Sequence, residues 1–457
     1  MTVSGLLFVV AFFVGLALAF IRNPLFGLLT YVSVFYLHPP SRWWGAFLPD
    51  LRWSMLAALV TLVATLRYQG DPSRPSWLST TPAKLLLIYT VWLWIQNFWA
   101  LEPDKHFECS VLFTKYLLVY YMFYKLLDTP EKIRWFYMVH ILGCLYLGMV
   151  AWTTPTSGRL DGVGGPGIDD SNTLGMHISA GAIAAATMML VEKKGWWALC
   201  ALACAFSLNT MVMAGSRGAF LALLTAGMLL ASMRPRAHSK KFFAYAIVGL
   251  LAFGAVASQQ FWERMNTLSA AVDEKHEFDP SAESRIEMAK AQLQMAKLYP
   301  LGSGHRGSEA LSARFLDRRY LSVDGARSSH NTLLTALVEQ GIPGLILFLA
   351  YCVWGWRSAL RLRKLSKADD FQLSVLQGTI AACSLLIVLV AGFFADFLKV
   401  EIQIWMAAIL VVVLQMNEKR VTATATSAIA PARTPLPAGQ QARVAVDPAI
   451  HKPGSGY

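Results

Sequence analysis

Long apolar stretches recur along the chain from Gly5 to Met416, and many are long enough to cross the hydrocarbon core of a bilayer. Hydrophobic residues make up 55% of the sequence and charged residues only 15%, whereas a soluble domain carries about a quarter charged residues. Most of the chain therefore lies in lipid. We expect an all-α, polytopic membrane protein with about 12 transmembrane helices.

The candidate spans are residues 5–20, 25–37, 54–66, 85–101, 109–124, 135–153, 173–190, 196–213, 218–233, 242–257, 331–356, 373–395 and 400–416. Two of the early segments are short for a bilayer, so we expect one of the first three to be re-entrant or interfacial. Residues 6–20 have no preceding basic residue and no following cleavage signal, so we expect this segment to be retained.

Basic residues mark every second loop of this arrangement. Lys and Arg gather in residues 125–134, 193–194, 234–241 and 357–367, and again after the last span at residues 419–420. Cytoplasmic loops carry such an excess. It accounts for the net charge of +12 without the basic soluble domain that nucleic-acid binding would need. We expect the other loops, among them residues 258–329, to face the periplasm.

The chain divides into four regions. Residues 1–257 and 330–416 hold the N-terminal and C-terminal transmembrane helices. The large polar loop at 258–329 separates them, and a loop of this length is usually functional. Within it, residues 284–299 alternate apolar and polar side chains at helical spacing, which predicts an amphipathic helix on the membrane or over a cavity. Residues 417–457 are rich in Ala, Thr and Pro and predict a disordered cytoplasmic tail.

Two polar residues at span boundaries are the first catalytic candidates. His330 begins a span on the expected periplasmic side, where a side chain that titrates near neutrality can take or give a proton. The alternative is an interfacial histidine that only caps a helix. Arg217 stands between two spans in Ala214-Gly-Ser-Arg217-Gly218, and an arginine at membrane depth is costly enough to suggest function. The alternative is an anchor at the interface.

Further candidates lie in the same expected compartment. Arg285 opens the amphipathic stretch, where a helix start and a guanidinium both favour phosphate; Arg306 is a weaker candidate of this kind. Asp396 could orient His330 or pair with an arginine, and a structural ion pair with Lys399 is the alternative. The Gly-rich segment that ends at Asn172 could bind sugar hydroxyls. Two arginines suit a diphosphate, and a neutral histidine suits a general base.

The six cysteines lie within or at the ends of apolar segments and show neither CxxC nor zinc spacing. Their pattern favours packing over a disulfide or a metal site.

These residues fall into motifs that resemble the O-antigen ligase and polymerase superfamily, most closely its O-antigen ligase and O-glycosylation ligase branches. The motifs are His330-Asn-x-x-Leu with Glu339-x-Gly341-x-x-Gly344, Ser216-Arg217-Gly218, Ser284-Arg285 leading to Pro300-Leu-Gly302-Ser-Gly304, and Gly167-Ile-x-Asp-x-Asn172. Asp170-Ser-Asn172 departs from the Asp-Asn-Asn expected there. The resemblance covers about residues 5–416.

The resemblance implies a GT-C-like, inverting glycosyltransferase that needs no metal or other cofactor and works at the periplasmic face of the bacterial inner membrane. Its donor would be a glycan on undecaprenyl diphosphate, and its acceptor lipid A–core. His330 would deprotonate the acceptor hydroxyl, and Arg217 and Arg285 would hold the diphosphate. Asn331 and Asn172, which stand in matching motifs, are candidate substrate contacts together with Arg306 and Asp396.

Three other functions stay open from the sequence. A polymerase that joins repeat units and a ligase that glycosylates protein Ser or Thr share the donor chemistry. A lipid-linked glycan transporter belongs to a different class and would need polar groups and broken helices near the bilayer centre. Here the polar groups gather at one boundary, which disfavours transport.

Overall fold

The computed structural model describes residues 2–155, 159–270, 280–323, 325–366 and 373–429, and every regular element in these residues is helical. The α-helices are α1 (Val3–Ile21), α2 (Leu25–Leu37), α3 (Trp53–Arg67), α4 (Thr81–Gln96), α5 (Pro103–Leu126), α6 (Pro130–Thr153), α7 (Ser171–Met188), α8 (Lys194–Ala214), α9 (Arg217–Met233), α10 (Ser239–Val256), α11 (Gln259–Ala270), α12 (Pro280–Leu298), α13 (Gly307–Phe315), α14 (Thr332–Glu339), α15 (Gly341–Ser366), α16 (Leu373–Ala391) and α17 (Ile402–Ile429). Short 3-10 turns lie at Pro39–Ser41, Gly45–Phe47, Trp77–Ser79, Arg236–His238 and Arg318–Tyr320.

Each candidate span falls on helical structure, and the described residues hold helices alone, so the all-α fold is confirmed. Among the described residues, 7 helical segments are long and apolar enough to cross a membrane. They are Val3–Ile21, Pro130–Thr153, Lys194–Ala214, Arg236–Val256, Gly341–Ser366, Leu373–Ala391 and Ile402–Arg420. The apolar helices α3 and α9 are shorter. The expected count of about 12 spans is therefore not confirmed.

One candidate span, residues 331–356, is wrong as a single helix. The chain breaks between α14 and α15, where Gly341 adopts φ 71°, a left-handed conformation that favours glycine. A Cβ atom at this position would lie 2.4 Å from the carbonyl carbon of Leu301. The next residue, Ile342, donates its backbone N–H to the carbonyl of Pro300 at 2.9 Å. The break thus lets the large loop dock against the bundle.

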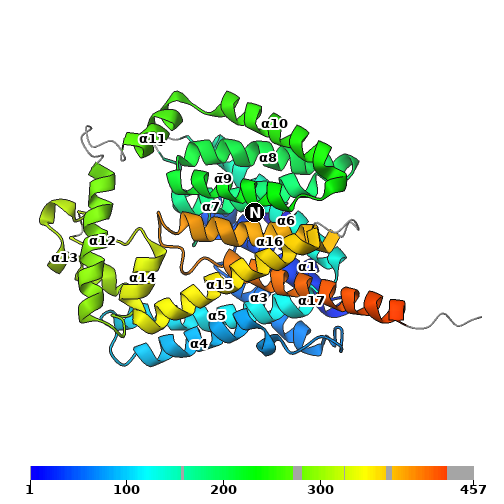
Figure 1. Ribbon diagram of the computed structural model, residues 1–457, viewed down its shortest axis with the longest axis horizontal. Helices are drawn as coiled ribbons and strands as arrows, with labels where there is room; N and C mark the ends of the chain where they lie inside the picture. Colours follow the sequence, from blue (N-terminus) through cyan, green and yellow to red (C-terminus); the bar gives the residue numbers. More distant parts are fainter. Residues whose placement is uncertain (1, 156–158, 271–279, 324, 367–372, 430–457) are drawn as a thin grey trace, which may run out of the picture.

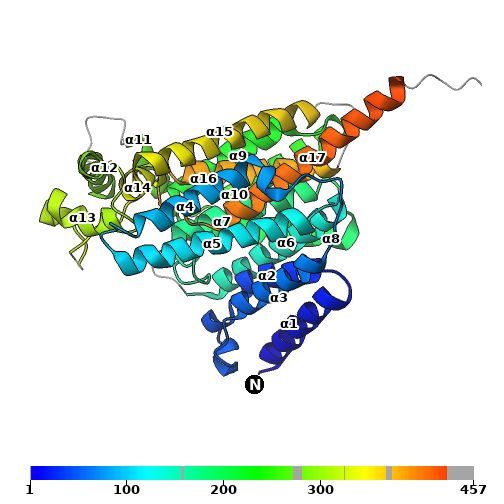
Figure 2. The same cartoon turned by 90° about the horizontal axis from the view of Figure 1, so that it is seen from below.

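The helices run side by side along the long axis of the molecule, with α12, α13 and α14 gathered at one end (Figure 1). Helices α1, α2 and α3 form one side of the bundle (Figure 2). The core is aromatic where α5, α6 and α17 meet. The Trp405 ring stacks on Phe123 at 5.6 Å between centroids and meets Phe136 edge-on at 6.0 Å.

Basic residues from distant parts of the chain meet at the end of the bundle away from α12–α14. Lys125 donates to the carbonyl of Gln69 at 3.0 Å, and Lys419 pairs with Asp71 at 2.9 Å. Nearby, Arg134 pairs with Glu192 at 2.6 Å. The loops that the charge pattern assigned to one side of a membrane therefore lie at one end of the molecule.

The large loop holds α11, α12 and α13. The amphipathic helix expected at residues 284–299 exists as α12. Met288, Ala291 and Met295 are buried, while Ile286 and Leu293 are 45% and 52% exposed. The helix has two apolar faces: one packs on α13 and α14, and the other remains exposed.

Helix α17 continues to Ile429, beyond the expected end of the last span at residue 416. The expectation of a disordered tail is therefore not met at residues 417–429. The rest of that tail, residues 430–457, lies outside the described residues.

Candidate active site

His330 lies immediately before α14, in a position that the helix start determines. The side chain of Asn331 caps α14: its Oδ1 accepts hydrogen bonds from two backbone N–H groups of the first turn at 2.9 and 3.1 Å. Thr332 anchors the same turn, because its N–H donates to the carbonyl of Gly392 at 2.7 Å and its Oγ1 to the carbonyl of Ala395 at 3.0 Å. The His330 backbone is therefore held between α14 and the end of α16.

The surroundings of His330 keep its imidazole neutral. Burial lowers the pKa of His330 to about 4, and the positive charges of Arg285, Arg327 and Arg159 act in the same direction. The carboxylate of Asp170 opposes them by raising this pKa. Three arginines and an aspartate from three separate segments thus surround one histidine, outside the membrane-spanning helices.

Arg327 forms a hydrogen bond with Ser284, the residue that precedes Arg285 in the sequence. Arg327 Nη2 donates to Ser284 Oγ at 2.8 Å, and the backbone N–H of Arg327 donates to Ser312 Oγ at 2.8 Å. The Nε of Arg327 is buried and has no hydrogen-bond partner within the described parts of the chain. A buried donor of this kind is costly unless a ligand or water accepts from it.

Asn172 connects Arg159 to the start of α9. Its Oδ1 accepts from Arg159 Nη2 at 2.8 Å and from Ser216 Oγ at 3.0 Å. Ser216 caps α9, and Arg217 is the first residue of that helix. Glycine is needed next in sequence, because a Cβ atom at Gly218 would lie 2.7 Å from Phe394 Cβ. Arg217 therefore lies one residue from the network that holds Arg159.

Helix starts add to the positive potential here. Helix α7 begins at Ser171 behind its cap Asp170, α9 begins at Arg217, and α14 begins after Asn331. The N-terminus of a helix carries a partial positive charge and free N–H groups, both of which favour a bound anion. The site therefore suits a highly charged anion such as a diphosphate. Among the described residues, no three His, Cys, Asp or Glu side chains gather as they would to hold a metal ion.

The structure brings together four of the residues singled out from the sequence: His330, Arg285, Asn172 and, one residue from the Asn172 network, Arg217. Asn331 adjoins them as a helix cap. Asp396 belongs to a different cluster, so the expectation that it orients His330 gains no support. Burial raises the pKa of Asp396 to about 6, and the charge of Glu339 adds to this shift, whereas Lys399 and His305 oppose it.

Arg306 also lies apart from the His330 cluster. Its side chain is 53% exposed and pairs with Glu309 at 3.4 Å.

Sequence reasoning missed two arginines of the site. Arg327 stands three residues before His330, and Arg159 lies in the Gly-rich segment that ends at Asn172. Proximity to these motifs was the available signal. Neither position differs in composition from the many other arginines in loops, so the sequence gives no reason to choose them.

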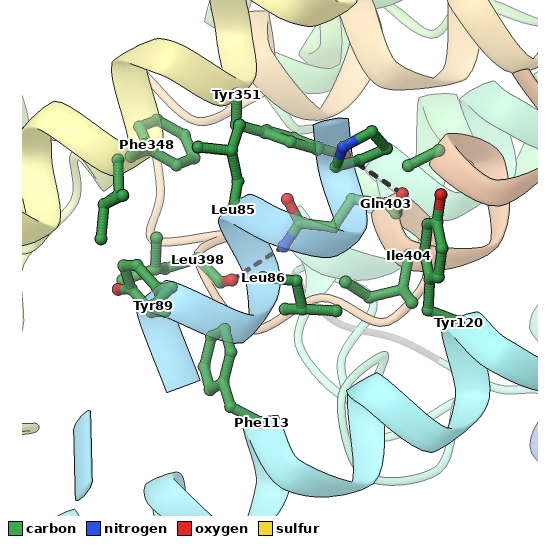
Figure 3. A pocket seen from close by; sticks show the side chains of 13 residues that line it. Leu85, Leu86, Tyr89, Phe113, Tyr120, Phe348, Tyr351, Leu398, Gln403 and Ile404 are labelled. Carbon is green, nitrogen blue, oxygen red and sulfur yellow. Dashed lines mark hydrogen bonds between the residues drawn. The ribbon is translucent and has the colours of Figure 1, made fainter. Parts of the chain in front are cut away.

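An apolar cavity lies between α4, α5, α15 and α17, apart from the charged cluster (Figure 3). Its lining consists mainly of leucines and aromatic rings. Among the polar groups there, the buried Tyr89 hydroxyl has no hydrogen-bond partner in the described residues, whereas Gln403 and Tyr351 are bonded within the protein. Gln403 Nε2 donates to the carbonyl of Leu398 at 2.8 Å, and Tyr351 donates to the carbonyl of Gln403 at 3.2 Å. Hydrocarbon, not a charged headgroup, fits such a lining.

A family model described as O-antigen ligase matches residues 202–349. The match begins within α8, ends within α15 and includes Arg217, Arg285 and His330. These residues are therefore similar to the O-antigen ligase family, which supports the resemblance to the O-antigen ligase and polymerase superfamily. Sequence comparison with curated proteins finds no match. Members of this superfamily are glycosyltransferase-like ligases and polymerases. Together with the long apolar helices, the family identifies a multi-pass membrane protein.

Proposed function

We propose that this protein is an O-antigen ligase, which transfers a glycan from undecaprenyl diphosphate to lipid A–core at the periplasmic face of the inner membrane. The observation that carries the proposal is the neutral imidazole of His330 among Arg285, Arg327 and Arg159. A neutral imidazole accepts a proton, and guanidinium groups bind phosphate through two parallel hydrogen bonds. The group that would act as the base and the groups that would stabilise the leaving diphosphate are therefore close together.

The reaction is a single displacement at the anomeric carbon. His330 accepts the proton of the acceptor hydroxyl as its oxygen bonds to the anomeric carbon. The bond between that carbon and the diphosphate oxygen breaks, and its electron pair leaves with the diphosphate. Attack from the face opposite the leaving group inverts the configuration. Arg285 and Arg217 stabilise the charge that develops on the diphosphate, so the protein supplies the electrostatic part of catalysis itself.

Donor binding would also prepare His330 for its role. In the free protein, burial first and the nearby guanidinium groups second lower the pKa of His330 and make the imidazole a weak base. A diphosphate between these groups offsets their charge and raises the pKa of His330. The base therefore strengthens when the donor is in place, which couples proton abstraction to donor occupancy.

The charge pattern supports a location at the periplasmic face. Lys125, Arg134 and Lys419 lie at the end of the bundle opposite α12–α14. Cytoplasmic loops carry the excess of Lys and Arg. With that end in the cytoplasm, the His330 cluster faces the periplasm.

Complementation tests the function. We expect the chain to restore a lipopolysaccharide ladder in a bacterial strain that lacks its own ligase. Arg285→Lys and Arg217→Lys should lose most of this activity, because lysine lacks the fork that binds two phosphate oxygens. Lys290→Gln, an exposed position on α12 that pairs with Glu287, serves as the matched control and should retain the ladder.

The same assay separates the alternatives. A wild-type chain that is expressed and inserted but gives no ladder in the ligase-null strain, and instead restores long chains in a polymerase-null strain, would contradict the ligase and favour the polymerase.

A further inference from the structure

A second cluster of ionisable side chains lies at the opposite end of α14 from His330. Glu339, the last residue of α14, is buried, and its two carboxylate oxygens accept from different groups. Ser308 Oγ donates to Oε1 at 2.9 Å, and His305 Nδ1 lies 3.0 Å from Oε2. His305 Nε2 in turn lies 2.9 Å from Lys399 Nζ, in the loop between α16 and α17. One carboxylate thus joins α14 to the large loop and, through His305, to the bundle.

The two ring nitrogens of His305 have different partners. Nδ1 faces the Glu339 carboxylate, which is an acceptor, and Nε2 faces the Lys399 ammonium, which is a donor, so the geometry fits a ring that donates from Nδ1 and accepts at Nε2. The backbone N–H of His305 donates to His106 Nδ1 at 2.8 Å, and His106 Nε2 lies 2.8 Å from the carbonyl of Leu93. Each side chain in this chain of contacts then has one donor or acceptor role toward each neighbour, which favours a single rigid arrangement of the cluster.

Helix α14 is short enough to transmit a displacement from one end to the other. It has 8 residues, about 12 Å at 1.5 Å per residue. Its C-terminal carbonyls are held as well: Ser303 donates its backbone N–H to Val338 at 2.9 Å, and Gly304 donates to Glu339 at 2.9 Å. The loop that makes these contacts follows α12, which carries Arg285 near its start.

We propose that Glu339 is a positioning residue of the transfer reaction: its contacts with Ser308 and His305 fix α14 so that His330 faces the arginine cluster. The proposal rests on the proposed function, because it assigns a role relative to His330 as the base. Glu339 acts through α14 and the loop, and the same contacts set the position of His330 relative to Arg285.

Glu339→Gln tests the proposal while preserving side-chain shape. Glutamine has one oxygen where glutamate has two. Its oxygen can accept from His305, but its amide N–H₂ then faces Ser308, whose hydroxyl must turn from donor to acceptor, and the negative charge is lost. We expect kcat to fall by about tenfold or more, with KM for the polyprenyl-diphosphate glycan changed less than about threefold. A displaced His330 is less buried and farther from the arginines. The acid limb of kcat/KM should therefore move upward by about one pH unit from its wild-type position.

The pH profile must be separated from the titration of a second group. Asp396 titrates in the range of interest, because its pKa is raised to about 6, so the profiles are compared in an Asp396→Asn background.

A second variant, Ser308→Ala, removes one of the two contacts of the Glu339 carboxylate and should shift the acid limb of kcat/KM in the same direction by less. It keeps the test available where Glu339→Gln fails to fold. Glu287→Gln, an exposed carboxylate on α12 that pairs with Lys290, should leave the limb unmoved.

The outcomes separate the inference from the proposed function. An acid limb that stays at the wild-type position in both Glu339→Gln and Ser308→Ala, with only the amount of active protein reduced, would overturn the positioning role. If the residual activity of His330→Ala instead shows the same acid limb as the wild-type protein, the assignment of the base is overturned, and with it the proposed function.

Discussion

The imidazole of His330 is neutral over the whole physiological range because burial and three guanidinium groups oppose its protonation. Only the neutral form can act as a base, so activity is lost as pH falls through the pKa of His330. In the free protein this pKa is about 4. We therefore expect the acid limb of kcat/KM, which reports the free enzyme, near pH 4.

The acid limb of kcat, which reports the donor complex, should lie at higher pH, because the bound diphosphate offsets the guanidinium charges. Parallel pH profiles of kcat and kcat/KM with a polyprenyl-diphosphate glycan provide the measurement. Coincident limbs would show that the diphosphate does not approach His330.

Arg327 offers a second test at the residue scale. Its buried Nε has no hydrogen-bond partner in the described structure, and it contributes to the low pKa of His330. We expect Arg327→Gln to weaken donor binding by about tenfold or more, the usual scale for a lost charged hydrogen bond. Isothermal titration with a short polyprenyl diphosphate measures this loss, with Lys290→Gln as the control. Unchanged affinity in Arg327→Gln would place the diphosphate elsewhere.

Sequence motifs singled out His330, Arg217 and Arg285 as candidates, but not Arg159 and Arg327. His330 and Arg217 stand out because a polar residue at a span boundary is unusual. Arg159 and Arg327 lie in polar loops where arginine is common, and only the folded chain brings them to His330. Asp396 had two interpretations from the sequence, a role beside His330 and an ion pair with Lys399, and the charges that act on it in the fold are those of Glu339, Lys399 and His305.

Among the elements, the break between α14 and α15 positions both clusters. Gly341 combines φ 71° with contacts of 2.4–2.6 Å from a built Cβ atom to the backbone of residues 300–302. Gly341→Ala should destabilise the protein by about 2 kcal/mol or more, through overpacking and backbone strain. Gly355→Ala is the matched control within α15, because its Cβ atom would meet nothing within 4 Å.

Thermal unfolding of the two purified variants in detergent tests this prediction. Gly341→Ala should unfold at a lower temperature than wild type, and Gly355→Ala at the same or a higher one, since alanine is the better helix former. Equal unfolding temperatures for the two variants would contradict the role assigned to the break.

Apolar patterning predicted where the helices lie but not where they dock. Residues 331–356 form one apolar run, and nothing local shows that Gly341 would adopt a left-handed conformation; the requirement comes from Pro300 and Leu301, which pack against it. Helix α12 has apolar side chains on two faces. Periodicity alone could not show that Met288 and Met295 face the protein while Ile286 and Leu293 do not.

The whole molecule has two chemically different ends, and the proposed orientation follows from them. Single cysteines in a background without the six native ones test it. Ala313→Cys lies in α13 near the site, and Pro72→Cys lies at the basic end; both positions are exposed. A membrane-impermeant maleimide should label Ala313→Cys in cells with a permeabilised outer membrane, and Pro72→Cys only after lysis. The reverse pattern would place the site in the cytoplasm.

The charge pattern predicted that alternate loops lie on one side of the membrane, and Lys125, Arg134 and Lys419 from three of these loops make their contacts at one end of the bundle. The number of spans was less predictable. Several helices are shorter or more polar than an isolated span, and their neighbours in the bundle cover them, as α7 illustrates with its largely buried surface. A hydropathy score is calculated from one segment at a time and does not include burial by neighbouring helices.

The most direct test of the account is the transfer rate of purified His330→Ala, measured with a polyprenyl-diphosphate glycan and lipid A–core, alongside donor affinity in the same preparation. We expect a rate lower by about 10²–10⁴-fold, the usual contribution of a well-placed base, with donor affinity within a few-fold of wild type because the arginines remain. Transfer at the wild-type rate by folded His330→Ala would contradict the role of His330 as the base.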